Sequence, residues 1–311
     1  MGEAGIKQFS ASLRHVPVMP KEIVSWLRPD PDAIVLDCTV GYCGHAAIIL
    51  ESSAPTGRVI GIDRDPQAIR ACEVEPQRFG GRLELVKGHF VDLKRHLADR
   101  GVAQVSGVLF DLGVSSPQLD EPARGFSFQA RGPLDMRMDQ SVGRTAAEIV
   151  NHADEADLAK MIFEFGEERF SRRIARAIVR DRMRKPFETT EELVSTIERA
   201  VPASYRRGRL HCATRTFQAL RIAVNEELDC LEPALRDAAD VLKPGGRLCV
   251  LSFHSLEDRI VKRTFRSLSG GQLTIKTKKP LMPTQEEMTL NPRSRSAKLR
   301  VAERTHEVTP P

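Results

Sequence analysis

A glycine-containing segment lies where an apolar run meets a helix-like stretch. Residues 37–45 read Asp-Cys-Thr-Val-Gly-Tyr-Cys-Gly-His. Glycine lets a ligand approach the backbone, and the start of the following helix offers free N–H donors. Asp63 stands 22 residues after Gly41, near the spacing of about 20 at which an acid binds ribose hydroxyls in dinucleotide sites. We therefore expect a nucleotide-like ligand at this loop, with a plain structural turn as the alternative.

The number of glycines in the loop indicates whether the ligand carries phosphates. The loop lacks the G-x-G-x-x-G pattern, because Gly41 is the single glycine before Gly44 in it. It is therefore a poor cradle for a pyrophosphate. A ligand with a ribose and an adenine but no phosphates fits better, and S-adenosylmethionine is such a ligand. The same observation disfavours a nicotinamide-dependent oxidoreductase.

Two more segments place polar and aromatic residues directly after apolar runs. Residues 111–118 read Asp-Leu-Gly-Val-Ser-Ser-Pro-Gln, and residues 252–259 read Ser-Phe-His-Ser-Leu-Glu-Asp-Arg. Ligands of open parallel sheets bind outside the carboxyl ends of the strands, which is where both segments are expected. Residues 124–128 and 132–139 combine glycine and charge with large apolar side chains. Such composition is typical of a functional lid, or of a structural loop with local ion pairs.

The elements that must position these segments alternate along the chain. We expect strands at residues 33–36, 59–63, 83–86, 107–111 and 247–252. Helix-like stretches at residues 44–52 and 66–74 separate the first three of them. Strands that alternate with helices and end in Asp or Ser predict a doubly wound parallel sheet in the α/β class.

The fourth and fifth expected strands are separated by about 135 residues, far more than a crossover helix needs. Helical periodicity follows at residues 146–165, 169–184 and 190–200. We expect a Rossmann-like sheet domain at residues 1–123 and 215–311, which ends in a basic C-terminal tail, and an inserted all-helical domain at residues 124–214. The helical run at residues 214–231 is assigned to the sheet domain, as the crossover helix before the fifth strand.

The basic residues are unevenly distributed, although the net charge is only +5. Residues 169–185 hold eight basic side chains against one acid, and residues 259–304 hold twelve against three. On a helix, one face would carry the five arginines Arg169, Arg173, Arg176, Arg180 and Arg184. Three more follow at Arg206, Arg207 and Arg209. A phosphate-rich partner would explain these runs, and a solvated helix face or flexible tail is the alternative.

The composition excludes several classes of protein. With 41% apolar and 29% charged residues, the chain is typical of a globular protein. It has neither an apolar run of about 18 residues nor the apolar core of a secretory signal, so we expect a cytoplasmic location and no membrane contact. Its six cysteines form no C-x-x-C pair, so we expect reduced thiols and no metal site.

Taken together, the motifs resemble a known family. They are residues 15–19, 37–45, 61–66, 111–118, 124–128, 132–139, 213–221, 252–262 and 291–296. The chain is similar over nearly its whole length to the bacterial 16S ribosomal RNA cytosine-N4 methyltransferases of the MraW type. The resemblance implies S-adenosylmethionine-dependent methylation of the exocyclic amine of a cytosine in the decoding region of the small subunit. It also implies a Rossmann-like class I methyltransferase sheet interrupted by a helical substrate-recognition domain.

The resemblance also implies roles for individual residues. The cofactor contacts of the family fall on Cys43, Gly44, His45, Asp63, Phe90, Asp111 and Gln118, with Asp63 binding the ribose. The common family loop has Phe and Gly where this chain has Val40 and Cys43. Because methyl transfer to an exocyclic nitrogen needs no covalent attack on the base, we expect no reactive role for Cys43.

The implied reaction needs an acceptor for the N4–H of the amine and a platform for a base taken out of its stack. Asp111 is the best-placed acceptor, and His254 and His15 are weaker candidates. Phe253 or Phe126 could stack on the base.

The implied partner is 16S ribosomal RNA, within the small subunit or a late precursor. Arginines of the helical domain are expected to clamp its phosphates; they are Arg169, Arg173, Arg176, Arg180, Arg206 and Arg207. A homodimer is a possibility. A non-catalytic RNA-binding assembly factor is the main alternative from another class, and cofactor binding at the glycine loop would discriminate between the two.

Overall fold

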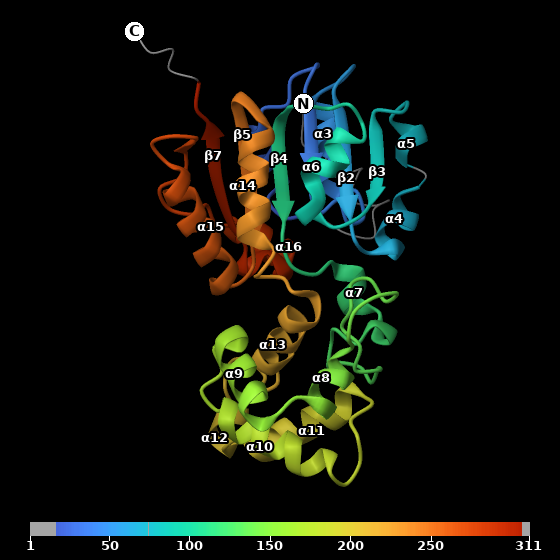
Figure 1. Cartoon of the computed structure of the whole chain (residues 1–311), viewed down its shortest axis with the longest axis vertical. Helices are drawn as coiled ribbons and strands as arrows, with labels where there is room; N and C mark the ends of the chain where they lie inside the picture. Colours follow the sequence, from blue (N-terminus) through green and yellow to red (C-terminus); the bar gives the residue numbers. More distant parts are fainter. Residues whose placement is uncertain (1–16, 74, 307–311) are drawn as a thin grey trace. The chain divides into compact units, whose positions relative to one another are not determined.

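The chain folds into two compact units in the computed structural model, which describes residues 17–73 and 75–306. The sheet unit comprises Met1–Gly113 and Leu228–Pro311, and the helical unit comprises Val114–Glu227 (Figure 1). None of the helices in the described ranges is long and apolar enough to cross a membrane.

The sheet unit is built on a twisted sheet whose strands run in the order β3-β2-β1-β4-β5-β7-β6. The strands are β1 Ile34–Asp37, β2 Arg58–Asp63, β3 Leu83–Lys87, β4 Val105–Asp111, β5 Leu242–Ser252, β6 Leu273–Ile275 and β7 Lys298–Arg304. Neighbours from β3 to β5 pair in parallel, and β7 runs antiparallel to both β5 and β6. The five expected strands and the Rossmann-like doubly wound sheet are confirmed, whereas β6 and β7 were not predicted.

Both faces of the sheet are covered by helices, as the continuous apolar runs of its strands require. On β4, Val108 and Phe110 enter one core and Leu109 enters the other. The first face packs against α6 Leu93–Ala98, α14 Leu231–Val241 and α15 Ser255–Leu268, which lie in front of the strands in Figure 1. The second packs against α2 Pro20–Leu27, α3 Gly44–Ser52 and α4 Pro66–Cys72. Shorter elements are α5 Glu75–Arg78, η1 Phe90–Asp92, α16 Gln285–Leu290 and η3 Pro292–Ser296.

The helical unit has its own apolar core. Its elements are α7 Ser116–Asp120, η2 Pro122–Arg124, α8 Ala146–His152, α9 Glu155–Gly166, α10 Ser171–Arg182, α11 Thr190–Ala200, α12 Ala203–Arg206 and α13 Thr214–Asn225. Leu158, Ile174 and Leu193 come from three successive helices and are fully buried together. The helices α8 and α11 each begin with a capping box, at Thr145 and Thr189, which satisfies backbone donors at both helix starts.

The prediction that the helical run at residues 214–231 belongs to the sheet domain, as the crossover helix before the fifth strand, is wrong. The helix α13 belongs to the helical unit, where Phe217 and Leu220 enter the core and the Gln218 side chain donates to the Phe165 carbonyl at 3.0 Å. It ends at Asn225 and is followed by its C-cap residue Glu226, which is left-handed with φ 52°; the helix that precedes β5 is α14. Helical periodicity reveals an apolar face but does not say which core that face joins.

The predicted basic C-terminal tail is also wrong. Residues 259–304 form most of α15 and then β6, α16, η3 and β7. In β7, the side chain of Arg300 is only 8% exposed and its Nε lies 2.6 Å from Asp258 Oδ1. Basic residues in this stretch therefore include sheet positions with partners inside the same unit.

Candidate active site

Three aspartates end neighbouring parallel strands at one edge of the sheet. Asp37 closes β1, Asp63 closes β2 and Asp111 closes β4. The strand order places β1 between the other two, and Asp37 is in register with Leu109 of β4. Phe253 follows β5 at the same edge, where Asp111 is in register with Leu251. These residues therefore lie at the carboxyl edge of the parallel strands, as the sequence predicted.

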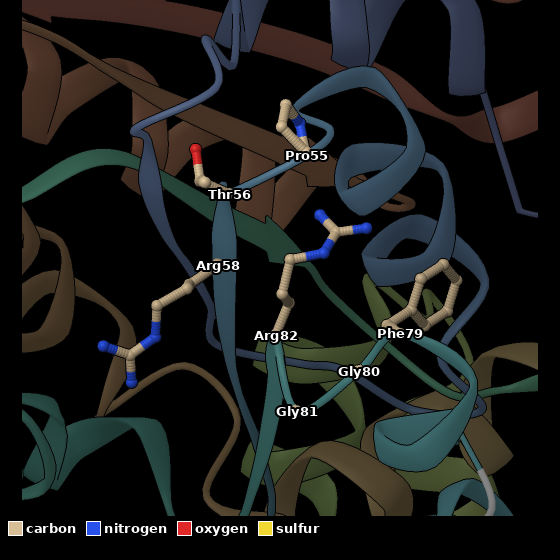
Figure 2. Close-up of a pocket in the computed structure, with 7 residues that line it drawn as sticks. All are labelled: Pro55, Thr56, Arg58, Phe79, Gly80, Gly81 and Arg82. Atoms are coloured by element: carbon tan, nitrogen blue, oxygen red, sulfur yellow. The ribbon is translucent and has the colours of Figure 1, made fainter.

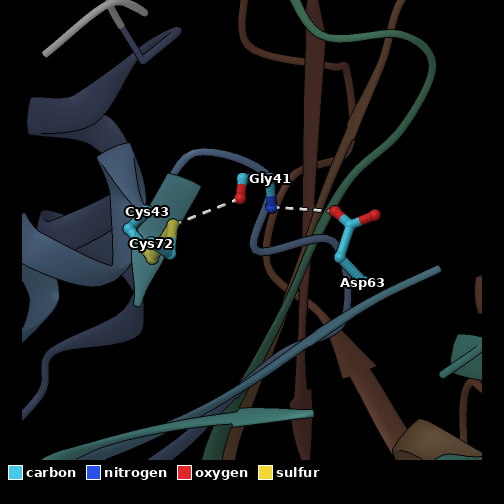
Figure 3. Close-up of a disulfide and its surroundings, with 4 residues drawn as sticks. All are labelled: Gly41, Cys43, Asp63 and Cys72. Atoms are coloured by element: carbon cyan, nitrogen blue, oxygen red, sulfur yellow. Dashed lines mark hydrogen bonds between the residues drawn. A yellow bond between two sulfur atoms is a disulfide. The ribbon is translucent and has the colours of Figure 1, made fainter. Parts of the chain in front are cut away.

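The glycine loop between β1 and α3 is held by this edge. Gly41 (φ 51°) and Cys43 (φ 63°) are both left-handed. The N–H of Gly41 donates to Asp63 Oδ2 at 2.8 Å (Figure 3). The N–H of Val40 donates to the Ile62 carbonyl at 2.9 Å. The helix α3 starts at Gly44 with no side-chain cap, so the first helical N–H groups retain their capacity for an anionic or polar ligand.

Asp63 can both hold the glycine loop and accept the expected ribose hydroxyls. Its Oδ2 accepts from Gly41 and its Oδ1 accepts from the Asp65 N–H, each at 2.8 Å. Burial raises the pKa of Asp63 to about 6, against the lowering effect of these two hydrogen bonds. Each carboxylate oxygen has a second lone pair, so the expected ribose hydroxyls can still be accepted. The sequence pattern did not reveal that Asp63 holds the loop.

The expectation that all cysteines are reduced is wrong. Cys43 and Cys72 form a disulfide with a Cα–Cα distance of 6.1 Å, which joins the glycine loop to the end of α4 (Figure 3). Both residues are buried. Cys72 Sγ also lies 3.3 Å from the carbonyl oxygen of Gly41. The Cys43 side chain therefore points into the protein. The remaining cysteines, which are Cys38, Cys212, Cys230 and Cys249, are not disulfide-bonded.

Asp111 presents one free acceptor atom. Its backbone N–H donates to Thr39 Oγ1 at 2.6 Å, and its Oδ2 lies 3.4 Å from His45 Nδ1. Its Oδ1 is buried and has no hydrogen-bond partner within residues 17–73 and 75–306. A buried carboxylate oxygen without a partner is costly unless a ligand or water supplies the donor, so this atom is a candidate for ligand binding.

Asp37 is a site residue that sequence reasoning missed. It is 1% exposed, and its Oδ1 accepts from the Thr39 N–H at 3.1 Å. Burial raises the pKa of Asp37 to about 7, partly offset by His45. It also ends an apolar run, as Asp63 and Asp111 do, and that shared position was the signal available in the sequence.

His45 was expected to contact the cofactor, but its side chain is turned inward. The imidazole is 6% exposed, with Nε2 2.8 Å from the Val18 carbonyl oxygen and Nδ1 facing Asp111. The backbone N–H of His45, at the uncapped start of α3, is the part of the residue that suits a ligand contact.

The two candidates after β5 differ in their surroundings. Phe253 is half-buried, and a Cβ added to Gly113 would lie 3.8 Å from its ring. His254 caps α15: its Nδ1 accepts from the Glu257 N–H at 3.5 Å, and its Nε2 lies 3.2 Å from Glu257 Oε1. The His254 imidazole thus has a structural task, and its catalytic role stays a prediction.

The other candidates are distributed over both units. Phe90, in η1 after β3, packs edge-on against Phe110 with ring centroids 5.5 Å apart. Gln118 belongs to the helical unit, where its Oε1 accepts from the Ser115 N–H at 2.9 Å. Phe126 is only 6% exposed and lies in the helical core, which argues against stacking on a base. His15 lies outside the described residues.

The arginines expected to bind phosphate are all exposed: Arg169, Arg173, Arg176, Arg180, Arg184, Arg206, Arg207 and Arg209. The guanidinium of Arg169 lies over the Tyr205 ring at 4.8 Å, which joins the start of α10 to α12. Arg176 pairs with Glu155 at 3.6 Å, and Arg180 pairs with Asp181 at 2.8 Å. Exposed pairs of this kind are worth at most about 1 kcal/mol, so they leave these side chains available to a phosphate.

A pocket of about 390 Å³ lies elsewhere on the sheet unit (Figure 2). It is lined by Pro55, Thr56, Arg58, Phe79, Gly80, Gly81 and Arg82. Arg58 begins β2 and Arg82 directly precedes β3, so the pocket lies at the amino ends of the strands. It is therefore at the opposite edge from Asp63 and is separate from the candidate site.

Comparison with known proteins identifies the family. The model of the MraW methylase family matches residues 12–305. A relative named ribosomal RNA small subunit methyltransferase H from Synechococcus elongatus is 52% identical over 294 residues, which cover 94% of this chain and 96% of the relative. Relatives with the same name from Geotalea daltonii and Brevibacillus brevis are 49% and 47% identical, again over 94% of this chain, and these matches cover 99% and 98% of the two relatives. The chain belongs to the MraW methylase family.

Proposed function

We propose that the protein is an S-adenosylmethionine-dependent methyltransferase of small-subunit ribosomal RNA that methylates N4 of a cytidine in the decoding region of 16S RNA. Family membership and the names of the relatives support the coarser part of this proposal. The observation that carries the finer part is the unpaired Oδ1 of Asp111, a buried acceptor at the edge where the cofactor is expected.

The residues at the edge suit the cofactor. Asp63 would accept the ribose hydroxyls, and the uncapped start of α3 would meet its polar groups. Phe90, in η1 after β3, would offer an aromatic surface to the adenine. Bound S-adenosylmethionine would supply a methyl group on a cationic sulfonium, whose charge the nearby carboxylates of Asp63 and Asp111 would favour.

The N4 amine of cytosine is weakly nucleophilic, because its lone pair is delocalised into the ring. The protein must therefore hold the amine in line with the methyl group, and such positioning can contribute on the order of 7 to 11 kcal/mol at best. Asp111 Oδ1 would accept one N–H of the amine and then its proton. Phe253, half-buried at the same edge, would stack on the extruded base.

The helical unit would supply RNA affinity through the exposed arginines of α10 and the loop after α12. The substrate within the small subunit or a late precursor, a homodimer, a cytoplasmic location and the absence of a metal remain predictions.

Nucleoside mass spectrometry of 16S RNA tests the proposal. A deletion strain that lacks its own enzyme of this family is complemented with the wild-type chain or with Asp111→Asn. We expect wild type to restore N4-methylcytidine in a decoding-region fragment and the variant not to restore it. A purely RNA-binding assembly factor would leave the RNA unmethylated in both strains.

A further inference from the structure

His45 is held in a way that defines where its protons lie. It is the second residue of α3, and its Nε2 is 2.8 Å from the Val18 carbonyl oxygen. A carbonyl oxygen can only accept, so Nε2 carries a proton. Nδ1 faces Asp111 Oδ2 at 3.4 Å. Any second proton of the ring therefore lies between Nδ1 and the Asp111 carboxylate.

The charged groups acting on His45 from the elements packed against it are carboxylates. Asp37 ends β1, Asp111 ends β4, and Glu287 on α16 accepts from the Met19 N–H at 2.6 Å. Burial lowers the pKa of His45, but the hydrogen bond to Asp111 and the charges of Asp111 and Asp37 outweigh it and raise the pKa. A raised pKa means that the imidazolium persists to higher pH than in a free histidine.

The Asp111 carboxylate thus has one oxygen beside the His45 imidazole and one oxygen that has no hydrogen-bond partner among the described residues. We propose that His45 is a positioning residue: its Nδ1–H beside Oδ2 orients the Asp111 carboxylate, so that Asp111 Oδ1 takes the proton released by the methylated amine. This inference rests on the proposed function, and it assigns to His45 a role other than cofactor contact.

The step balances without another reactant. The lone pair of the amine forms the new N–C bond while the S–C bond breaks, and the electron pair of that bond stays on sulfur. The nitrogen, now cationic, loses one proton to Asp111 Oδ1, which becomes a carboxylic acid. His45 keeps both of its protons. The positive charge of the sulfonium has been replaced by the proton on Asp111, which leaves to water when the products depart.

Two substitutions separate this role from a structural one. In His45→Asn the side-chain amide stands where Nδ1 was, so it can still donate to Asp111 but loses Val18. In His45→Gln the amide stands where Nε2 was, so it keeps Val18 but loses Asp111. A structural role would be rescued by Gln, whereas the proposed role would be rescued in part by Asn.

The measurement is single-turnover methyl transfer to 16S RNA between pH 5 and pH 9, with saturating cofactor. We expect His45→Gln to be about tenfold slower at pH 7, the factor set by loss of one hydrogen bond to a charged group. The acid limb of its pH profile should lie at higher pH than that of wild type, because the positive charge beside the carboxylate has been removed. The rate of His45→Asn at pH 7 should lie between those of His45→Gln and wild type. Cofactor affinity should change less than about threefold.

His96→Asn serves as the control, because His96 is also a buried histidine of the sheet unit but lies on α6, outside the site. Its profile should superimpose on that of wild type. A His45→Gln profile with the wild-type acid limb, or a Gln variant faster than the Asn variant, would overturn the inference. A wild-type protein that transfers no methyl group would instead overturn the proposed function.

Discussion

The buried carboxylate of Asp37 should make the sheet unit less stable at alkaline pH. Its pKa is about 7 in the folded protein, against 3.8 for an exposed aspartate, and burial is the main cause. Well below pH 4, both the folded and the unfolded chain are protonated at this residue. Between pH 4 and pH 7 the unfolded chain ionises while the folded chain keeps the proton, so stability falls by about 1.4 kcal/mol per pH unit. Above pH 7 the loss is complete, at about 4 kcal/mol as an upper bound.

Asp37→Asn isolates this effect, because the Asn Oδ1 can still accept from Thr39 while the charge is gone. We expect the variant and wild type to have similar free energies of unfolding at pH 4, and the variant to be more stable by up to about 4 kcal/mol at pH 8. Urea unfolding can be followed by the fluorescence of Trp26, the single tryptophan of the chain, which lies in the sheet unit.

Asp99→Asn, at an exposed carboxylate of the same unit, is the control and should show no pH-dependent difference. If the Asp37→Asn difference stays constant from pH 4 to pH 8, the assignment of a burial-raised pKa to Asp37 is refuted.

Other predictions concern the ligands. Asp63→Ala should weaken S-adenosylmethionine binding by about tenfold or more in calorimetry, because it removes hydrogen bonds made to a charged group; agreement with wild type within about twofold would contradict its role. Asp111→Ala should slow single-turnover methyl transfer by at least about a hundredfold at saturating RNA, and a near-normal rate would eliminate it as the acceptor. Replacing three exposed arginines of α10 by Gln should flatten the plot of log K against log salt by about two units, with cofactor binding unchanged. These are Arg173, Arg176 and Arg180. An unchanged slope would mean that they form only a solvated face.

The parallel strands could be predicted because each is an apolar run that ends in a polar residue at a turn. β7 could not, because Lys298, Arg300 and Arg304 make it look like a charged segment, and their partners come from other elements. The length of the insertion was visible, but the side of the boundary on which α13 falls depends on the core that its apolar face joins. That information lies in tertiary packing and not in periodicity.

For the site, strand order alone brings Asp63 and Asp111 together, so spacing and the rule for parallel sheets were sufficient. Side-chain direction was not available from the pattern. His45 turns inward to Asp111 and Phe126 packs in the helical core, and each result depends on neighbours far away in the sequence. The pairing of Cys43 with Cys72 has the same origin, since it needs the folded positions of α3 and α4.

The Cys43–Cys72 disulfide turns part of the chain into a covalent ring. The ring contains α3, β2 and α4, and therefore both Asp63 and the start of α3. Closing a loop of this length removes about 3.5 kcal/mol of chain entropy from the unfolded state in the entropy model. In the oxidised protein the glycine loop and the end of α4 cannot separate by local fluctuation, so their amides should open to hydrogen exchange in one shared event. Reduction would divide that event into two, with the loop free to open on its own.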